Sequence, residues 1–96
     1  MPNLPKIHAK IIVEGIVQGV SFRAYTRKKA RQLDLTGYVK NLRNGNVRIE
    51  VEGIQKEILK LIDWVKNQGS PASTVTNVKV EWQNELENYS NFRIAY

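Results

Sequence analysis

Residues 7–33 read IHAKIIVEGIVQGVSFRAYTRKKARQL, and the hydrophobic periodicity of this stretch changes at its two glycines. Before the glycines, apolar residues occupy every second position, as in a strand with one buried face: Ile7, Ala9, Ile11 and Val13. After the glycines, less polar residues recur at helical spacing: Phe22, Thr26, Ala30 and Leu33. The stretch therefore predicts a strand over residues 7–13, a glycine loop over residues 15–21 and a helix over residues 22–33.

The rest of the chain continues the alternation of strands and helices. Residues 36–43 and 47–51 are predicted to be strands, and Asn44-Gly45 between them is a strong signal for a two-residue hairpin turn. A second helix is indicated by an apolar stripe that ends before Gly69: Ile54, Ile58, Leu61, Ile62 and Val65. Residues 78–82 alternate as a fourth strand, and residues 92–95 can add a short last one.

This element order determines the expected fold. The sequence β-α-β-β-α-β predicts an α+β fold of the ferredoxin-like, split βαβ type, with an antiparallel sheet and both helices on one face. A chain of 96 residues is long enough for one hydrophobic core, so we expect a single domain over residues 1–96. Right-handed crossovers make the first two strands parallel, which brings the glycine loop and Asn41 to the same edge of the sheet.

Composition limits the kinds of chemistry that are available. The chain has no cysteine, which excludes thiolate catalysis and fits a reducing, cytoplasmic location. Its acidic residues lack metal-ligand spacing, and no apolar run reaches the roughly 20 residues of a membrane span, so we expect no metal, cofactor or membrane partner. The net charge of +6 favours an anionic partner, either a small phosphate compound, a nucleic acid or an acidic surface.

The glycine loop is a candidate anion site. Gly15 and Gly19 allow the backbone to curl so that successive N–H groups point inward, and the loop leads directly into a helix N-terminus. Arg23 adds a permanent positive charge in the first turn of that helix. The residues alone leave open a plain strand-to-helix turn, a solvated Arg23, and an Asn41 that serves only the hairpin.

Two motifs resolve this ambiguity by resemblance. They are Gly15-x-Val17-Gln18-Gly19-Val20-x-Phe22-Arg23, and Gly37-Tyr38-Val39-Lys40-Asn41-x-x-x-Gly45-x-Val47 followed by Gly53. In order and spacing they resemble both signatures of the acylphosphatase family, enzymes that hydrolyse the carboxyl–phosphate bond of acyl phosphates. The chain departs from the commonest pattern at Ser21, where glycine is frequent, and at Asn44, where aspartate usually precedes the turn glycine. Neither departure affects Arg23 or Asn41.

The resemblance implies a role for each motif residue. Arg23 and Asn41 would be catalytic, with the Asn41 side chain orienting the attacking water and the phosphate oxygens of the substrate accepting its proton. The phosphate would be bound by the first motif: Gly15, Ile16, Val17, Gln18, Gly19, Val20, Ser21 and Phe22. An acyl phosphate suits a site without a side-chain base, because its carboxylate leaving group is a weak base. Inorganic phosphate would be product and competitive inhibitor of a monomeric enzyme.

Other functions remain as alternatives. A basic ferredoxin-like domain could bind nucleic acid on its open sheet face, but the sequence predicts no aromatic residues there. The cations Arg27, Lys28, Lys29 and Arg31 are better explained as the exposed and C-terminal part of a helix. In a partner-binding domain Trp64 and Trp82 would be interface anchors. The phase of Trp82 along its strand favours a place in the core. For Trp64 the sequence does not decide between core and surface, and His8 is predicted to be at the surface.

Overall fold

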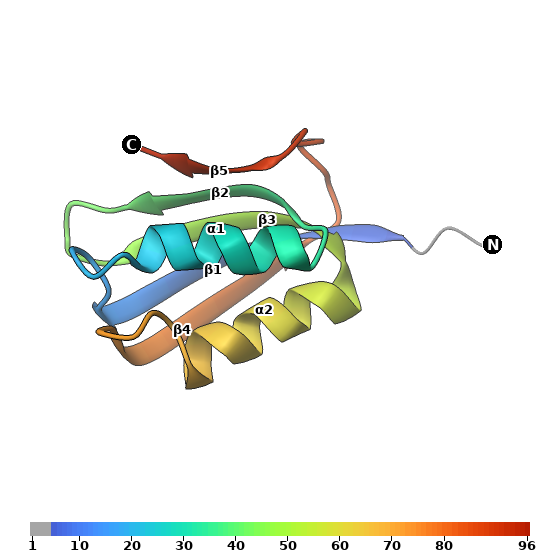
Figure 1. The fold of residues 1–96 in the computed structure, drawn as a ribbon. Coiled ribbons are helices and arrows are strands. Elements are labelled where there is room, and N and C mark those ends of the chain that lie inside the picture. Colours follow the sequence, from blue (N-terminus) through green and yellow to red (C-terminus); the bar gives the residue numbers. More distant parts are fainter. Residues whose placement is uncertain (1–4) are drawn as a thin grey trace.

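The computed structural model describes residues 5–96. Its elements are β1 (Lys6–Ile16), α1 (Phe22–Gln32), β2 (Thr36–Asn41), β3 (Val47–Ile54), α2 (Gln55–Asn67), β4 (Thr74–Gln83) and β5 (Phe92–Ala95). The sheet order is β4-β1-β3-β2-β5, and both helices cover one face, while the other, open face carries no helix of the described residues (Figure 1). The predicted ferredoxin-like fold is confirmed. The sheet is mixed rather than purely antiparallel, because β5 pairs with β2 in parallel.

The hydrophobic core lies between the sheet and the helices, as the alternation of β1 and the stripes of the helices predict. Ala9, Ile11 and Val13 of β1 face the helices and are fully buried. They meet Ile58, Leu61 and Val65 of α2, which are also fully buried, in one cluster. The aromatic ring of Trp64 stacks on Phe22 at 6.0 Å between centroids, so Trp64 belongs to this core.

Trp82 does not belong to the core, and that prediction is wrong. It pairs with Ala9 and so faces the helix side, as its phase indicated, but its side chain is 37% exposed. The reason is that β4 is an edge strand of the sheet that residues 5–96 form, so no described strand lies beyond it. Phase predicts the face of a sheet toward which a side chain points, whereas burial depends also on what covers that face.

The β2–β3 hairpin has a three-residue loop rather than the predicted two-residue turn. The backbone N–H of Gly45 donates to the carbonyl of Leu42, and the N–H of Leu42 donates to the carbonyl of Asn46. Gly45 alone of the loop residues has a positive φ, at 92°. The Asn44 side chain instead accepts a hydrogen bond from the N–H of Asn46 at 3.1 Å. This is the pattern of a turn followed by a glycine bulge.

β1 extends three residues beyond its predicted end and carries an irregularity between Glu14 and Gly15 in its pairing with β4. Gly15 has a φ of 132°, and a Cβ atom there would collide with the backbone carbonyl oxygen of Thr74. Gly15 is therefore required by the close approach of β4. The irregularity redirects the chain from the strand into the loop that precedes α1.

Candidate active site

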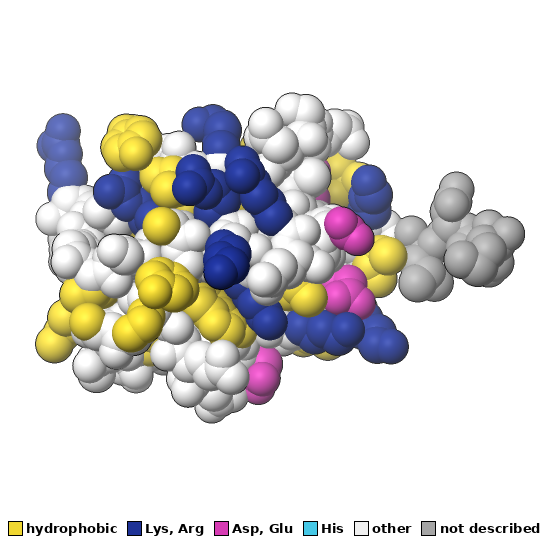
Figure 2. Space-filling model, viewed as in Figure 1, with side chains coloured by type: hydrophobic (Ala, Val, Ile, Leu, Met, Phe, Trp, Pro, Cys, Tyr) yellow, Lys and Arg dark blue, Asp and Glu magenta, His cyan; other side chains and the backbone are white. Residues whose placement is uncertain are grey.

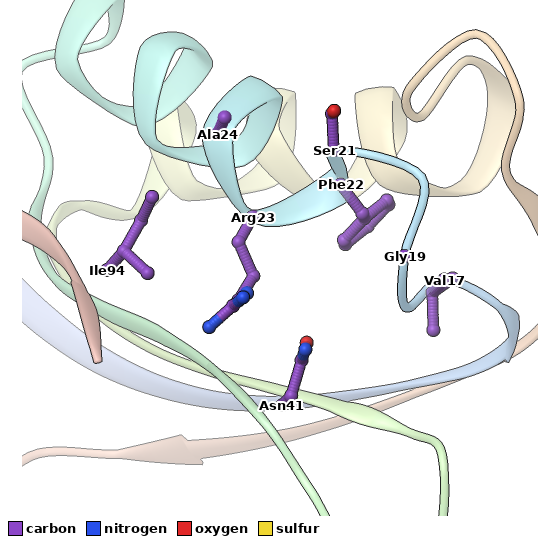
Figure 3. Close-up of a pocket in the computed structure, with 8 residues that line it drawn as sticks. All are labelled: Val17, Gly19, Ser21, Phe22, Arg23, Ala24, Asn41 and Ile94. Atoms are coloured by element: carbon purple, nitrogen blue, oxygen red, sulfur yellow. The ribbon is translucent and has the colours of Figure 1, made fainter. Parts of the chain in front are cut away.

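The loop after β1, the first turn of α1 and the end of β2 enclose a cavity of about 340 Å³. Its lining combines residues far apart in the sequence: Val17, Gly19, Ser21, Phe22, Arg23, Ala24, Asn41 and Ile94. In Figure 3, Arg23 extends from the helix and Asn41 from the sheet into the same space. The structure therefore brings together the two residues that the sequence analysis singled out as catalytic.

The loop reaches the helix through left-handed backbone conformations. Gly19 has a φ of 74°, and Ser21, the N-cap of α1, has a φ of 59°. The Ser21 side chain makes no capping hydrogen bond, and the first turn of α1 contains no acidic residue. The N–H groups and the positive end of the helix dipole at this terminus are consequently not neutralised by a side chain, which favours an anion in the cavity.

The guanidinium of Arg23 is held by the C-terminal strand. Its Nη1 atom donates to the carbonyl oxygen of Ala95 at 3.4 Å, and its Cζ atom lies 4.9 Å from the centroid of the Tyr96 ring. Within residues 5–96 no carboxylate side chain forms an ion pair with Arg23. The guanidinium therefore keeps its charge and most of its donors for an anion that enters the cavity.

Asn41 is the last residue of β2 and pairs with Val47. Its Oδ1 atom is buried and has no hydrogen-bond partner among the described residues. Leaving a buried acceptor unpaired costs about 1–3 kcal/mol, so an amide oxygen in this position is suited to accept a hydrogen bond from a bound molecule. A water between Asn41 and an anion held by the loop would satisfy this acceptor.

The structure separates the predicted phosphate-binding residues into two groups. Val17, Gly19, Ser21 and Phe22 line the cavity beside Arg23 and Asn41. Outside its lining are Gly15, Ile16, Gln18 and Val20. Ile16 is 62% exposed, the Val20 side chain packs against the core, and the Gln18 side chain is directed to the hairpin. For these four residues a direct role in binding phosphate stays a prediction.

Sequence reasoning missed Ala24 and Ile94 in the lining. Ile94 belongs to β5 and pairs with Val39 of β2. It therefore lies beside the strand that carries Asn41. The sequence indicates that residues 92–95 can form a short last strand, but it does not predict that this strand pairs with β2 in parallel. Only that pairing brings Ile94 next to the site.

Basic residues are concentrated on α1, the helix that begins at the cavity. Figure 2 shows Lys and Arg side chains gathered over the face that carries α1. The cations of α1 make no ion pair with any carboxylate of residues 5–96: Arg23, Arg27, Lys28, Lys29 and Arg31. Such a concentration of one sign of charge raises the local concentration of anions and the rate at which they arrive.

The open face of the sheet contains a second polar cluster, and here the prediction for His8 is wrong. His8 is 2% exposed, with Nε2 2.5 Å from the Glu50 carboxylate and Nδ1 2.8 Å from that of Glu52. Glu52 also accepts hydrogen bonds from the backbone N–H groups of Glu87 and Asn88. The segment before β5 thus covers His8, which alternation along β1 alone could not show.

Aromatic rings also lie on this face, contrary to the sequence-based expectation. Tyr38 of β2 and Tyr89 are in edge-to-face contact, with ring centroids 6.0 Å apart, and the ring of Tyr89 lies 6.0 Å from that of His8. Burial and the surrounding carboxylates raise the pKa of Tyr89 to about 12. Both rings pack against other side chains of the polar cluster. They are therefore not free to stack on the bases of a nucleic acid.

We expect the His8 cluster to make stability depend on pH. Burial lowers the pKa of His8, but the hydrogen bonds to Glu50 and Glu52 outweigh it and raise the pKa above 6.5. Burial raises the pKa of Glu52, but hydrogen bonds from Glu87, His8 and Asn88 bring it below 4.5. The contribution of His8 to the free energy of unfolding is complete below pH 6.5 and is lost as pH rises through the raised pKa. The contribution of Glu52 to the same free energy is complete above pH 4.5 and is lost as pH falls through its lowered pKa.

Urea unfolding at pH 5.5 and at pH 8.5 would measure this effect. At pH 5.5 we expect His8→Gln to lose about 1.5–3 kcal/mol of unfolding free energy, with a smaller loss at the higher pH. Lys10→Gln, on the same face of β1, is the control and should leave the pH dependence unchanged. An equal loss from His8→Gln at both pH values would contradict a charged His8.

None of the described helices is long and apolar enough to cross a membrane. No group of three or more His, Cys, Asp or Glu side chains within residues 5–96 is arranged to hold a metal ion.

Comparisons with known proteins point to one family. A family model described as Acylphosphatase matches residues 9–94. The acylphosphatase of Pelotomaculum thermopropionicum is 41% identical over 93 residues, covering 97% of this chain and 100% of the relative. That of Archaeoglobus fulgidus is 46% identical over 90 residues, covering 94% and 99%. The crystal structure of acylphosphatase from Bacillus subtilis superposes with a TM-score of 0.91 at 40% identity, covering 94% and 99%.

Proposed function

Because this chain belongs to the acylphosphatase family and is an acyl phosphate hydrolase, we propose that the cavity between Arg23 and Asn41 is its active site. One observation carries the proposal. Three features converge on a single cavity: a guanidinium that forms no ion pair within residues 5–96, a helix N-terminus without a capping side-chain hydrogen bond, and a buried amide oxygen without a partner in the same range. The first two features bind an anion, and the third suits a water molecule.

The phosphate group is bound by the loop and Arg23. Backbone N–H groups from Val17 to Phe22 and the guanidinium donate to its oxygens, which also neutralises the charge that develops during the reaction. Ile94 and Ala24 provide an apolar wall. Because these contacts are to the phosphate and not to the acyl chain, the site accepts acyl phosphates of different acyl groups.

Asn41 positions the nucleophile. Its Oδ1 atom accepts a hydrogen bond from the attacking water, which forms a P–O bond as the bond from phosphorus to the carboxyl oxygen breaks. The electron pair of the broken bond leaves on the carboxylate, and the proton of the water passes to a phosphate oxygen of the substrate. No side-chain base is required, because carboxylate is a good leaving group and the water is already in place.

The same site explains the expected behaviour with product. Inorganic phosphate fits the cradle that binds the substrate's phosphate, so it acts as a competitive inhibitor.

We further propose that the chain works as a monomeric, cytoplasmic enzyme built from one domain over residues 1–96, and that nucleic acid is not its partner. The buried carboxylates of Glu50 and Glu52 on the open face support the last point.

The direct test is hydrolysis of benzoyl phosphate by the purified protein without added metal. The rate is measured as the release of inorganic phosphate. We expect turnover that phosphate inhibits competitively and that a chelator does not alter. Turnover that requires a divalent cation, or phosphate inhibition that is not competitive, would contradict the proposed mechanism at this site.

A further inference from the structure

The side chain of Gln18 connects the loop to the β2–β3 hairpin. Its Nε2 atom donates to the carbonyl oxygen of Leu42 at 2.7 Å and to that of Asn46 at 2.8 Å. These two carbonyls flank the hairpin loop, one on each side. In the described part of the chain, these are the hydrogen bonds that join residues 17–21 to residues 42–46. Both hydrogens of the amide are used.

The two ends of this connection lie next to the reacting groups. Gln18 is between Val17 and Gly19, which line the cavity, and Leu42 directly follows Asn41. The loop follows β1, whereas the hairpin loop follows β2. Each has a glycine with a positive φ, Gly19 at 74° and Gly45 at 92°. A donor that bonds both arms of the hairpin therefore fixes the loop relative to the end of β2.

We propose that Gln18 is a positioning residue, which sets the distance between the phosphate held by the loop and the water held by Asn41. This inference rests on the proposed function of Asn41. Attack on phosphorus requires the water to be placed in line with the leaving carboxylate, and a displacement of about 1 Å can cost about a hundredfold in rate. The side chain of Gln18 touches neither reactant, because it is bonded to the hairpin and lies outside the cavity lining.

The variant Gln18→Met keeps the length of the side chain and removes both donors. We expect kcat to fall by about 10- to 100-fold. The KM and the inhibition constant of inorganic phosphate should change by less than about threefold, since the backbone cradle and Arg23 remain. Gln32→Met, at an exposed glutamine of α1, is the matched control and should keep kcat, KM and the inhibition constant of phosphate unchanged. A rise in KM without a fall in kcat would overturn the proposal.

A double-mutant cycle with Asn41→Ala tests whether Gln18 acts through Asn41. If it does, Gln18→Met should lower kcat by less than about twofold in the Asn41→Ala background, because the water is no longer positioned. A fall as large as in the wild-type background would overturn the inference. Thermal unfolding of each variant verifies that the fold is kept. If Gln18→Met does not fold, Gln18→Asn, which has the amide but a shorter reach, replaces it.

An independent measurement separates this inference from the proposed function. The side-chain amide resonances of Asn41 in the NMR spectrum should shift or broaden in Gln18→Met and stay unchanged in Gln32→Met. If Asn41→Ala retained wild-type turnover, the proposed role of Asn41 would fail, and the NMR comparison would still decide the positioning by Gln18. Unchanged Asn41 resonances in Gln18→Met would overturn it.

Discussion

Asn41→Ala is expected to lower kcat for benzoyl phosphate by about a hundred- to a thousandfold, because the variant loses the acceptor that positions the attacking water. The inhibition constant of inorganic phosphate should stay within about threefold of the wild-type value, since the loop and Arg23 are intact. We also expect the variant to fold, because the oxygen that it removes has no hydrogen-bond partner among residues 5–96. Steady-state kinetics with phosphate as competitor would measure both constants.

Asn67→Ala is a suitable control for this experiment, because Asn67 is exposed at the end of α2. It should leave kcat and phosphate inhibition unchanged. A wild-type kcat in folded Asn41→Ala would exclude the water-positioning role while leaving the phosphate site in place. A parallel loss of phosphate affinity would instead indicate that Asn41 contacts the phosphate itself.

Arg23→Ala should lower kcat/KM by about a hundredfold or more and weaken phosphate inhibition, because the fixed positive charge of the cavity is lost. Arg23→Lys is expected to recover only part of this loss, since an ammonium keeps the charge but not the planar fork of donors. Titration with inorganic phosphate by calorimetry would measure the binding component separately from turnover.

The matched control is Arg27→Ala, one turn further along α1. It removes the same charge from the same helix outside the cavity lining. Its effect should be small and should decrease with salt, as for long-range steering. If Arg23→Ala and Arg27→Ala had equal effects at high salt, Arg23 would act only through the general charge of the helix.

Much of the fold could be predicted from the sequence because its signals are local. The alternation of Ile11 and Val13, the helical stripe through Ile58 and Leu61, and the glycines of the loop each depend on neighbours within a few residues. The handedness of crossovers then brought the loop and Asn41 to one edge of the sheet. The expectation that Arg23 and Asn41 lie close together follows from the same reasoning and from the resemblance of the two motifs.

Several features were decided only by tertiary structure, because they depend on which segments lie side by side. Burial of His8 requires Glu50, Glu52 and the segment before β5, none of which is near it in sequence. The exposure of Trp82 follows from the edge position of β4.

The sequence by itself determined the family, the order of elements and the two residues that meet in the cavity, since motif spacing and periodicity are properties of the chain. Only the tertiary structure decided that Ile94 joins the site and that Gln18 connects the loop to the hairpin. The physical reason is that a hydrogen bond across 24 or 28 residues depends on the arrangement of two strands in space, and no local pattern records it.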